Sequence, residues 1–130
     1  MIVDASALVA TLLDEPARAA IEDLLASTPE AAVPAHSLVE ASMVLTSRAG
    51  PVGRQAVRGL VAELGLPVLP FEARHWAVAV DAFERFGKGR HPAALNVGDC
   101  LTYAVARLER QPLLCLGDDF ARTDLDVIRP

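Results

Sequence analysis

The sequence predicts an α/β fold in which a short parallel sheet is covered by helices on both faces. Short apolar segments recur along the chain without the polar–apolar alternation of a half-exposed strand, which is typical of strands buried on both sides. Longer segments with the apolar spacing of helices lie between most of them, and such alternation favours a parallel sheet. The 130 residues, 52% of them hydrophobic, suit one domain over residues 1–130 whose core needs no disulfides.

Five short segments are expected to form strands. They are the apolar stretches 1–4, 31–34, 67–71 and 112–116, with 126–129 as a candidate fifth. The first ends at Asp4, and the fourth is followed by Gly117 and the acids Asp118 and Asp119. Open α/β sheets bind ligands outside the carboxyl ends of their strands. Asp4 and an acid of the later pair are therefore expected where this class of fold has its chemistry.

Six segments are expected to form helices, and several carry residues that usually mark a helix end. Ser6 is placed to cap the first helix. Gly50 and Gly65 are placed to end the third and fourth helices, and Pro51 lies near the start of the fourth. The expected helices are 7–13, 15–27, 36–50, 51–65, 72–87 and one that begins within 94–107.

Two further acids belong to helices, and each taken singly has an ordinary structural explanation. Glu40 lies in the helix after the second strand and could belong to a solvated stripe. Asn96 and Asp99 have the spacing of a capping box at the start of the last helix, where the positive helix end favours an ionised carboxylate. Taken together with Asp4 and an acid of 118–119, they predict that several carboxylates converge at one edge of the sheet.

Converging carboxylates predict a bound cation. Close like charges and burial both raise the pKa of a carboxyl group, and a cation removes this conflict. Mg²⁺, with Mn²⁺ able to substitute, prefers oxygen ligands and is commonly shared with a phosphate. Cys100 and Cys115 lack CxxC spacing, so no zinc site is predicted and both are expected to be buried thiols in a reducing compartment.

The charge distribution bears on the partner. A net charge of −5 argues weakly against nucleic acid, but positive charge is concentrated in the segment RFGKGRHP, which contains Arg85, Lys88, Arg90 and His91. The N-terminus has no basic start and is unlike a signal peptide, and no apolar run approaches the roughly 20 residues of a membrane span. We therefore expect a soluble cytoplasmic protein that does not contact a membrane.

The sequence resembles PIN-domain ribonucleases, specifically the VapC toxins of bacterial type II toxin–antitoxin systems. The resemblance runs from end to end and rests on the stretches MIVDASAL, LVEASMVL, GKGRHPAALNVGDCLTYAVA and LLCLGDDFARTD. It implies a PIN-like three-layer α/β/α sandwich with a short central parallel sheet. It also implies Mg²⁺- or Mn²⁺-dependent cleavage of RNA, a VapB-type antitoxin that blocks the site, and a toxin homodimer.

The resemblance also implies roles for individual residues. Asp4, Glu40 and Asp99 match the acidic site residues of the family, and Ser6 and Asn96 match positions that support the site. The carboxylates would hold one or two metal ions that activate a water against the scissile phosphate. By resemblance, the products carry a 5′-phosphate and a free 3′-hydroxyl, and the basic segment 85–92 would contact flanking phosphates.

The fourth acid of the family pattern lies in the stretch GDDF. We expect Asp118 to fill this role, because it is the first side chain beyond the sharp turn that Gly117 permits. Asp119 comes one residue later and is expected to cap the short turn that follows. A slip of one position in the match would exchange the two roles.

Three other interpretations remain open. A haloacid-dehalogenase phosphatase also has an aspartate after its first strand, but it needs a second two residues later, where this chain has Ser6. A phospho-receiver domain needs a paired acid early in the chain and a lysine after a late strand, whereas Lys88, the only lysine, follows an expected helix. A catalytically silent PIN-like module that only binds an antitoxin is the third, and the intact acids argue against it.

Overall fold

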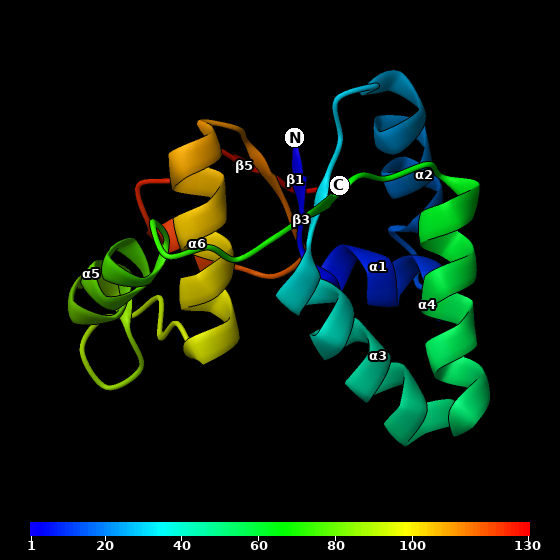
Figure 1. The fold of residues 1–130 in the computed structure, drawn as a ribbon, viewed down its shortest axis with the longest axis horizontal. Helices are drawn as coiled ribbons and strands as arrows, with labels where there is room; N and C mark the ends of the chain where they lie inside the picture. The colour runs from blue at the N-terminus through cyan, green and yellow to red at the C-terminus, as the bar shows by residue number, and fades with distance from the viewer.

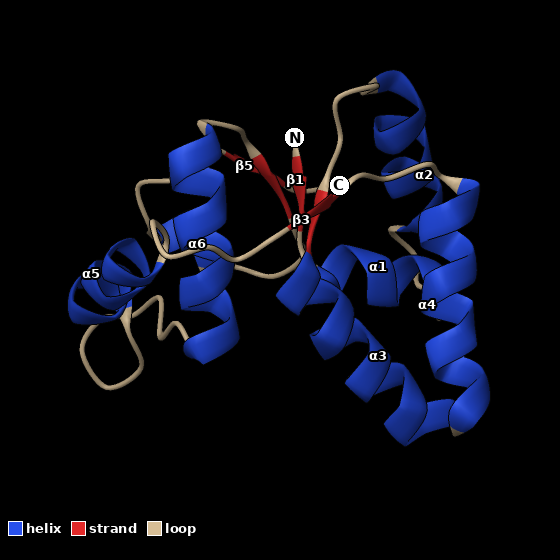
Figure 2. Ribbon diagram, viewed as in Figure 1, coloured by secondary structure: helices blue, strands red, loops and turns tan.

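The computed structural model describes residues 1–130 as a narrow parallel sheet with helices on both sides (Figures 1 and 2). The strands β1, β4 and β5 pair in that order, and β2 pairs with β3. A parallel bridge between Ile2 and Ala32 joins the two groups, which gives the order β3-β2-β1-β4-β5. The strands are β1 (Ile2–Val3), β2 (Val33–Pro34), β3 (Val68–Leu69), β4 (Leu113–Leu114) and β5 (Val127–Ile128). All five expected strands are confirmed, and all pair in parallel.

Six α-helices cover the sheet. Figure 1 shows α1 to α4 on one side of the strands and α5 and α6 on the other. The three-layer arrangement expected from the sequence is therefore confirmed. The helices are α1 (Ala5–Leu12), α2 (Arg18–Ser27), α3 (Ala35–Ala49), α4 (Pro51–Glu63), α5 (Trp76–Phe86) and α6 (Val97–Glu109), and a short 3₁₀ helix η1 spans Phe120–Arg122.

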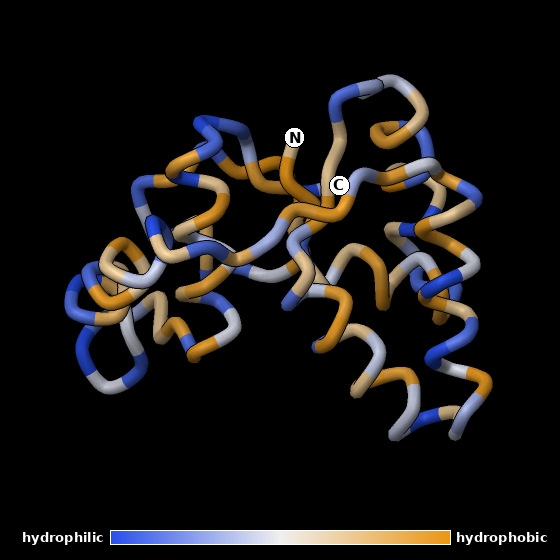
Figure 3. Tube along the Cα trace, in the orientation of Figure 1, coloured by the Kyte–Doolittle hydropathy of each residue, from blue (hydrophilic) through white to orange (hydrophobic).

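Each face of the sheet has its own hydrophobic core. Val3 and Leu114 pack with α1 to α4, whereas Ile2 and Leu113 pack with α5 and α6. Successive strand residues point to opposite faces, so two apolar neighbours per strand serve both cores. This explains why the strand segments are continuously apolar. Figure 3 shows the apolar chain running along the central strands while polar segments lie at the outer turns.

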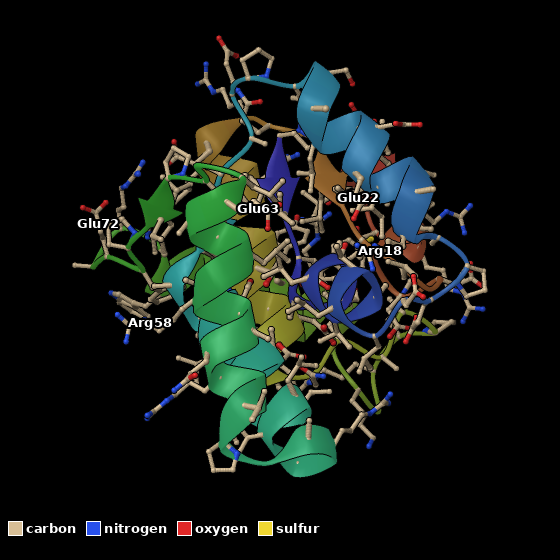
Figure 4. The ribbon with its side chains drawn as sticks, turned by 90° about the vertical axis from the view of Figure 1, so that its right-hand side faces the viewer. Arg18, Glu22, Arg58, Glu63 and Glu72 are labelled. Carbon is tan, nitrogen blue, oxygen red and sulfur yellow. The ribbon has the colours of Figure 1, made fainter.

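Charged side chains lie on the outer helix faces. Arg18 Nε donates to Glu22 Oε1 over 2.7 Å on α2, and Figure 4 shows this pair, together with Arg58 and Glu63 on α4. Exposed pairs of this kind contribute only about 0.3–0.5 kcal/mol each. None of the helices is both long enough and apolar enough to cross a membrane.

Two helix starts differ from the sequence prediction. The prediction that Ser6 caps the first helix is wrong, because α1 begins at Ala5 and the Asp4 carboxylate accepts the capping hydrogen bond from the Ser6 backbone N. Asp4 is still extended at the strand end, as an N-cap residue must be. Helix α5 begins at Trp76 rather than at residue 72, because His75 Nδ1 accepts from the Glu72 backbone N in a tight turn before it.

Gly53 is expected to be important for stability where α4 crosses α3. A Cβ at this position would lie 2.4 Å from the Leu45 carbonyl carbon and oxygen. These are backbone atoms of α3, so relief of the clash would require the two helices to move apart. Gly53→Ala is therefore expected to lower the free energy of unfolding by about 2–3 kcal/mol. Gly59 on the same helix faces open space, so Gly59→Ala should raise it by about 0.5–1 kcal/mol. Urea denaturation of both variants measures the contrast, and equal changes would contradict the close approach.

Candidate active site

Asp4 is a buried carboxylate at the carboxyl end of β1. Only 7% of its surface is exposed. Its Oδ2 accepts two hydrogen bonds from Ser6, one from the backbone N at 3.0 Å and one from Oγ at 2.6 Å. Both donors use the same oxygen, so Oδ1 accepts no hydrogen bond from a side chain or capping group of the chain.

Ser6 connects Asp4 to the end of β4. Its Oγ donates to Asp4 and accepts a hydrogen bond from the Leu116 backbone N at 3.0 Å. The hydroxyl therefore fixes the Asp4 carboxylate relative to the chain that leads to Asp118 and Asp119. A serine or threonine suits this position because one hydroxyl can donate and accept at once.

Glu40 reaches from α3 to the first turn of α6. Its Oε2 lies so close to Gly98 that a Cβ there would be only 2.8 Å away. Burial, and then the charges of Asp4 and Asp99, raise the pKa of the Glu40 carboxyl above its ordinary value. Three of the expected acids, from the β1–α1 junction, α3 and α6, are therefore near enough for their charges to interact.

Asp99 is held by the capping box at the start of α6. The Asn96 side chain accepts from the Asp99 backbone N at 2.9 Å, and Asp99 Oδ2 accepts from the Asn96 backbone N at 2.8 Å. The capping box expected from the sequence is confirmed. The pKa of Asp99 is nevertheless raised to about 6, because burial outweighs the lowering effect of the Asn96 hydrogen bond and the charges of Asp4 and Asp119 add to it. The helix start alone therefore does not keep this carboxylate at an ordinary pKa.

The two acids after β4 lie in different surroundings. Asp118 Oδ1 accepts a hydrogen bond from Arg129 and its side chain is exposed. Burial is the main reason that the pKa values of Asp99 and Cys115 are raised, and the charge of Asp119, unlike that of Asp118, adds to both shifts. The charge of Asp119 therefore acts on Asp99, whereas the charge of Asp118 is paired with Arg129.

The prediction that Asp119 caps the turn after β4 is wrong. The residue precedes η1 but its side chain makes no capping hydrogen bond. Its backbone already has helical angles, φ −62° and ψ −53°, whereas a capping side chain needs an extended backbone to reach back to the helix. The carboxylate of Asp119 is thus not used by the local fold.

The donor set suits a hard divalent cation. No three His, Cys, Asp or Glu side chains are gathered as a ready ligand cage. Mg²⁺ does not need such a cage, because it keeps several waters and binds through one or two carboxylates together with substrate phosphates. The thiols do not compete, since both cysteines are buried and burial raises the pKa of Cys100, and that of Cys115 to about 12.

Comparisons with known proteins identify the family. The PIN domain family matches residues 1–125. Ribonuclease VapC36 of Mycobacterium tuberculosis is 48% identical over 127 residues, which cover 97% of this chain and 91% of that protein. The chain belongs to the VapC ribonucleases of the PIN-domain family. The resemblance predicted from the sequence is thus confirmed.

Solved structures share the fold of this PIN domain at low sequence identity. VapC20 of Mycobacterium tuberculosis, a toxin that cleaves the sarcin–ricin loop, superposes with a TM-score of 0.81 at 20% identity, over 99% of this chain and 98% of that one. VapBC2 from Rickettsia felis, bound to a DNA fragment from its promoter, gives a TM-score of 0.79 at 14% identity, over 99% and 97%. These matches support the α/β fold with a short parallel sheet.

The basic loop of this PIN domain is the segment 85–92, whose first two residues end α5, and several of its side chains make contacts within the fold. Arg85 donates to Asp124 at 2.9 Å and to the Tyr103 hydroxyl at 3.3 Å, and the Arg90 guanidinium lies 5.0 Å from the centre of the Phe83 ring. Among the basic side chains predicted to contact RNA, Arg85 is therefore the one most engaged within the protein.

The other two residues of the loop differ from each other. Lys88 is exposed, and its side chain makes no hydrogen bond or ion pair within the chain. His91 Nδ1 accepts from the Ala93 backbone N at 3.1 Å, and its ring packs edge-on against Phe86. Lys88 thus has the side chain that is most available to a phosphate.

Gly98 is a site residue that the sequence reasoning missed. The signal was a glycine in the first turn of an otherwise well-capped helix, where alanine has the better helix propensity. Gly98→Ala would place a Cβ 2.8 Å from Glu40 Oε2 and 3.2 Å from Asn96 Oδ1. Because the Glu40 carboxylate is the end of a flexible side chain, we expect it to move away while the protein stays folded.

The expected result of Gly98→Ala is a 10- to 100-fold loss of RNA cleavage, the order of magnitude that about 1 Å of misplacement costs. Cleavage of an RNA oligonucleotide and the melting temperature would be measured together. Gly59→Ala, in open space on α4, is the matched control and should cleave normally. Full activity in a folded Gly98→Ala protein would show that the Glu40–Gly98 contact has no role in the site.

Proposed function

We propose that this chain is the toxin of a type II toxin–antitoxin system and acts as an endoribonuclease by metal-dependent hydrolysis. The observation that carries the proposal is the approach of Asp4, Glu40 and Asp99 from three elements of the fold, where burial and the charges of neighbouring acids raise the pKa values of Glu40 and Asp99. Such a cluster is costly unless a cation neutralises it, and shifted pKa values of this kind mark functional sites. The name of the relative VapC36 supports RNA as the substrate. The VapBC2 structure supports a VapB-type antitoxin as the partner.

Ribonucleases of the PIN-domain family are in general dependent on divalent metal ions, and we propose Mg²⁺, with Mn²⁺ able to substitute. Asp4 and Asp99 each offer Oδ1, because Ser6 and Asn96 occupy their Oδ2 atoms. Asp119 completes the carboxylate set. When bound, the cation lowers the pKa of a water and neutralises negative charge at the scissile phosphate.

Glu40 is the proposed proton acceptor. Its carboxylate lies near enough to Asp4 and Asp99 for their charges to act on it, and a carboxylate positioned beside the metal ligands can take a proton from the attacking water. Gly98 leaves the space in which Glu40 Oε2 rests beside the capping turn of α6. Attack by water on phosphorus then breaks the bond between phosphorus and the 3′ oxygen. Glu40 takes the proton that the attacking water loses, the 3′ oxygen takes a proton from solvent water and leaves as a hydroxyl, and the other product keeps the phosphate at its 5′ end.

The basic loop is proposed to contact phosphates that flank the cut. Lys88 contributes most, because its charge is not used within the chain, and Arg90 and His91 lie in the same loop. Arg85 acts through the fold, since its ion pair with Asp124 joins α5 to the segment before β5. Assembly of the toxin as a homodimer stays a prediction.

Removal of the metal tests the proposed function. Purified protein is expected to cleave RNA in Mg²⁺ or Mn²⁺, to stop in EDTA and to recover on addition of either ion. An oligonucleotide with a 2′-O-methyl group at the scissile nucleotide should still be cut, since water and not the sugar is the nucleophile, and the products should carry 5′-phosphates. Cleavage that persists in EDTA with 2′,3′-cyclic phosphate ends would contradict the mechanism. Antitoxin binding without any cleavage would favour the catalytically silent module.

A further inference from the structure

The acids Glu40 and Asp99 are carried by helices on opposite sides of the sheet. Helix α3 packs mainly with α1 and α4, whereas α6 packs mainly with α5 on the other side, and the two helices also contact each other directly (Figure 1). Neither helix alone fixes the spacing between the two carboxylates. Some contact between α3 and α6 must set that spacing if the site is to be formed before metal or RNA binds.

One partly buried polar contact joins these two helices close to the acids. His36 Nε2 and Thr102 Oγ1 are 3.0 Å apart, and Ser37 Oγ lies 3.5 Å from the same Thr102 oxygen. No other side-chain hydrogen bond in the structure connects α3 with α6. Ser37 and Thr102 are completely buried, and His36 is partly exposed.

The position of this contact along each helix relates it to the site. His36 is four residues before Glu40 on α3, and Thr102 is three residues after Asp99 on α6. Residues three or four apart lie on the same face of a helix, about one turn away. The contact is therefore one turn from each acid, on the faces that the two helices turn toward one another.

The His36 ring is itself held in place from the other side. Phe71 packs edge-on against it, with ring centres 6.0 Å apart, and His75 packs on Phe71 at 5.2 Å. His75 is 1% exposed, and its Nδ1 accepts from the Glu72 backbone N at 2.8 Å. The His36 ring thus contacts both Thr102 and the segment that leads into α5. A change of its rotamer would break this packing.

We propose that His36 and Thr102 are a positioning pair, whose hydrogen bond between α3 and α6 sets the distance from Glu40 to Asp99 and so prepares the site for its metal ion. The inference rests on the proposed function. It assigns no contact with RNA or metal to either residue. Outer partners that orient ligands in this way typically contribute 10- to 100-fold in metal affinity or activity.

The test compares Thr102→Val with Thr102→Ser. Valine has nearly the shape of threonine but no hydroxyl, and serine keeps the hydroxyl. Mn²⁺ affinity would be measured by titration of the protein without RNA, and kcat and KM with an RNA oligonucleotide. Thr102→Val is expected to bind Mn²⁺ at least 10-fold more weakly and to lose a similar factor in kcat, with KM changed less than twofold. Thr102→Ser should restore most of both losses.

Two results would overturn the inference. One is a Thr102→Val protein with wild-type Mn²⁺ affinity and kcat, and the other is equal losses in the valine and serine variants, which would indicate packing alone. His36→Gln is a second route if Thr102→Val does not fold, and weakened Mn²⁺ binding with KM retained is the result expected of it; unchanged binding counts against the pair. A wild-type chain that binds Mn²⁺ but cuts no RNA would overturn the proposed function alone, because the affinity comparison still tests the positioning pair.

Discussion

Asp99→Asn is expected to abolish RNA cleavage and, at the same time, to stabilise the metal-free protein at neutral pH. Asp99 is one of the proposed metal ligands, so loss of its charge removes activity. The same charge is costly to the fold, because burial raises the pKa of Asp99 to about 6 from its ordinary value of 3.8. Asparagine keeps an oxygen that can accept from the Asn96 backbone N, so the helix cap is retained.

The sign of the pH dependence follows from the direction of the shift. The folded protein holds the Asp99 proton more tightly than the unfolded chain, so ionised Asp99 destabilises the fold above about pH 6. This cost fades as the pH falls toward 4. The gain from Asp99→Asn in EDTA should therefore be on the order of 1–2 kcal/mol at pH 8, after allowance for partial exposure, and should nearly vanish at pH 4.5.

Addition of metal should reverse the order of stability. Mn²⁺ binds the folded wild-type protein and stabilises it by RT ln(1 + [L]/Kd), whereas the variant has lost a ligand and gains little. Melting temperatures in EDTA and in Mn²⁺ measure both effects, with Asp126→Asn as a control at an exposed acid outside the site. A folded Asp99→Asn protein that still cleaves RNA, or that is less stable than wild type in EDTA at pH 8, would show that Asp99 is not part of a strained carboxylate cluster.

The sequence predicted those features that depend on neighbours along the chain. The capping box of Asn96 and Asp99 spans four residues, and the place of Asp4 follows from a strand that ends there. Both could be predicted because a capping box and a strand end each depend on residues only a few positions apart in the sequence. The continuously apolar strand segments also predicted the covered sheet. Each strand contributes residues to both cores, so a short stretch of sequence shows that both faces are buried.

Features that depend on distant partners could not be predicted in this way. Arg85 was expected in an RNA-binding loop, yet its partner Asp124 lies 39 residues further along the chain. Local spacing predicted that Ser6 caps a helix, and only the family resemblance gave it a supporting role at the site; its hydroxyl in fact holds Asp4 and contacts Leu116, 110 residues away. In each case a tertiary contact determines what the side chain does, and no local pattern records it.

The choice between Asp118 and Asp119 is a further case. The sequence placed Asp118 nearest the turn, but Arg129, which is 11 residues later on the chain leaving β5, pairs with it. An acid with an arginine partner is a weaker ligand for a cation, because that charge is already compensated. Asp119 has no ion pair and no capping bond, and its charge reaches Asp99. We therefore propose Asp119 as the fourth acid.

Asp119→Asn is expected to weaken Mn²⁺ binding and RNA cleavage at least 10-fold, whereas Asp118→Asn should keep both within about twofold. Loss of the exposed Asp118–Arg129 pair should cost no more than about 1 kcal/mol in the free energy of unfolding. Asp119→Asn should leave that free energy unchanged or slightly raised in EDTA, because it relieves repulsion on Asp99. Mn²⁺ titration, cleavage rates and urea denaturation of the two variants separate the roles. The opposite pattern would mean that Asp118 leaves Arg129 to join the metal, and that the ion pair belongs only to the metal-free protein.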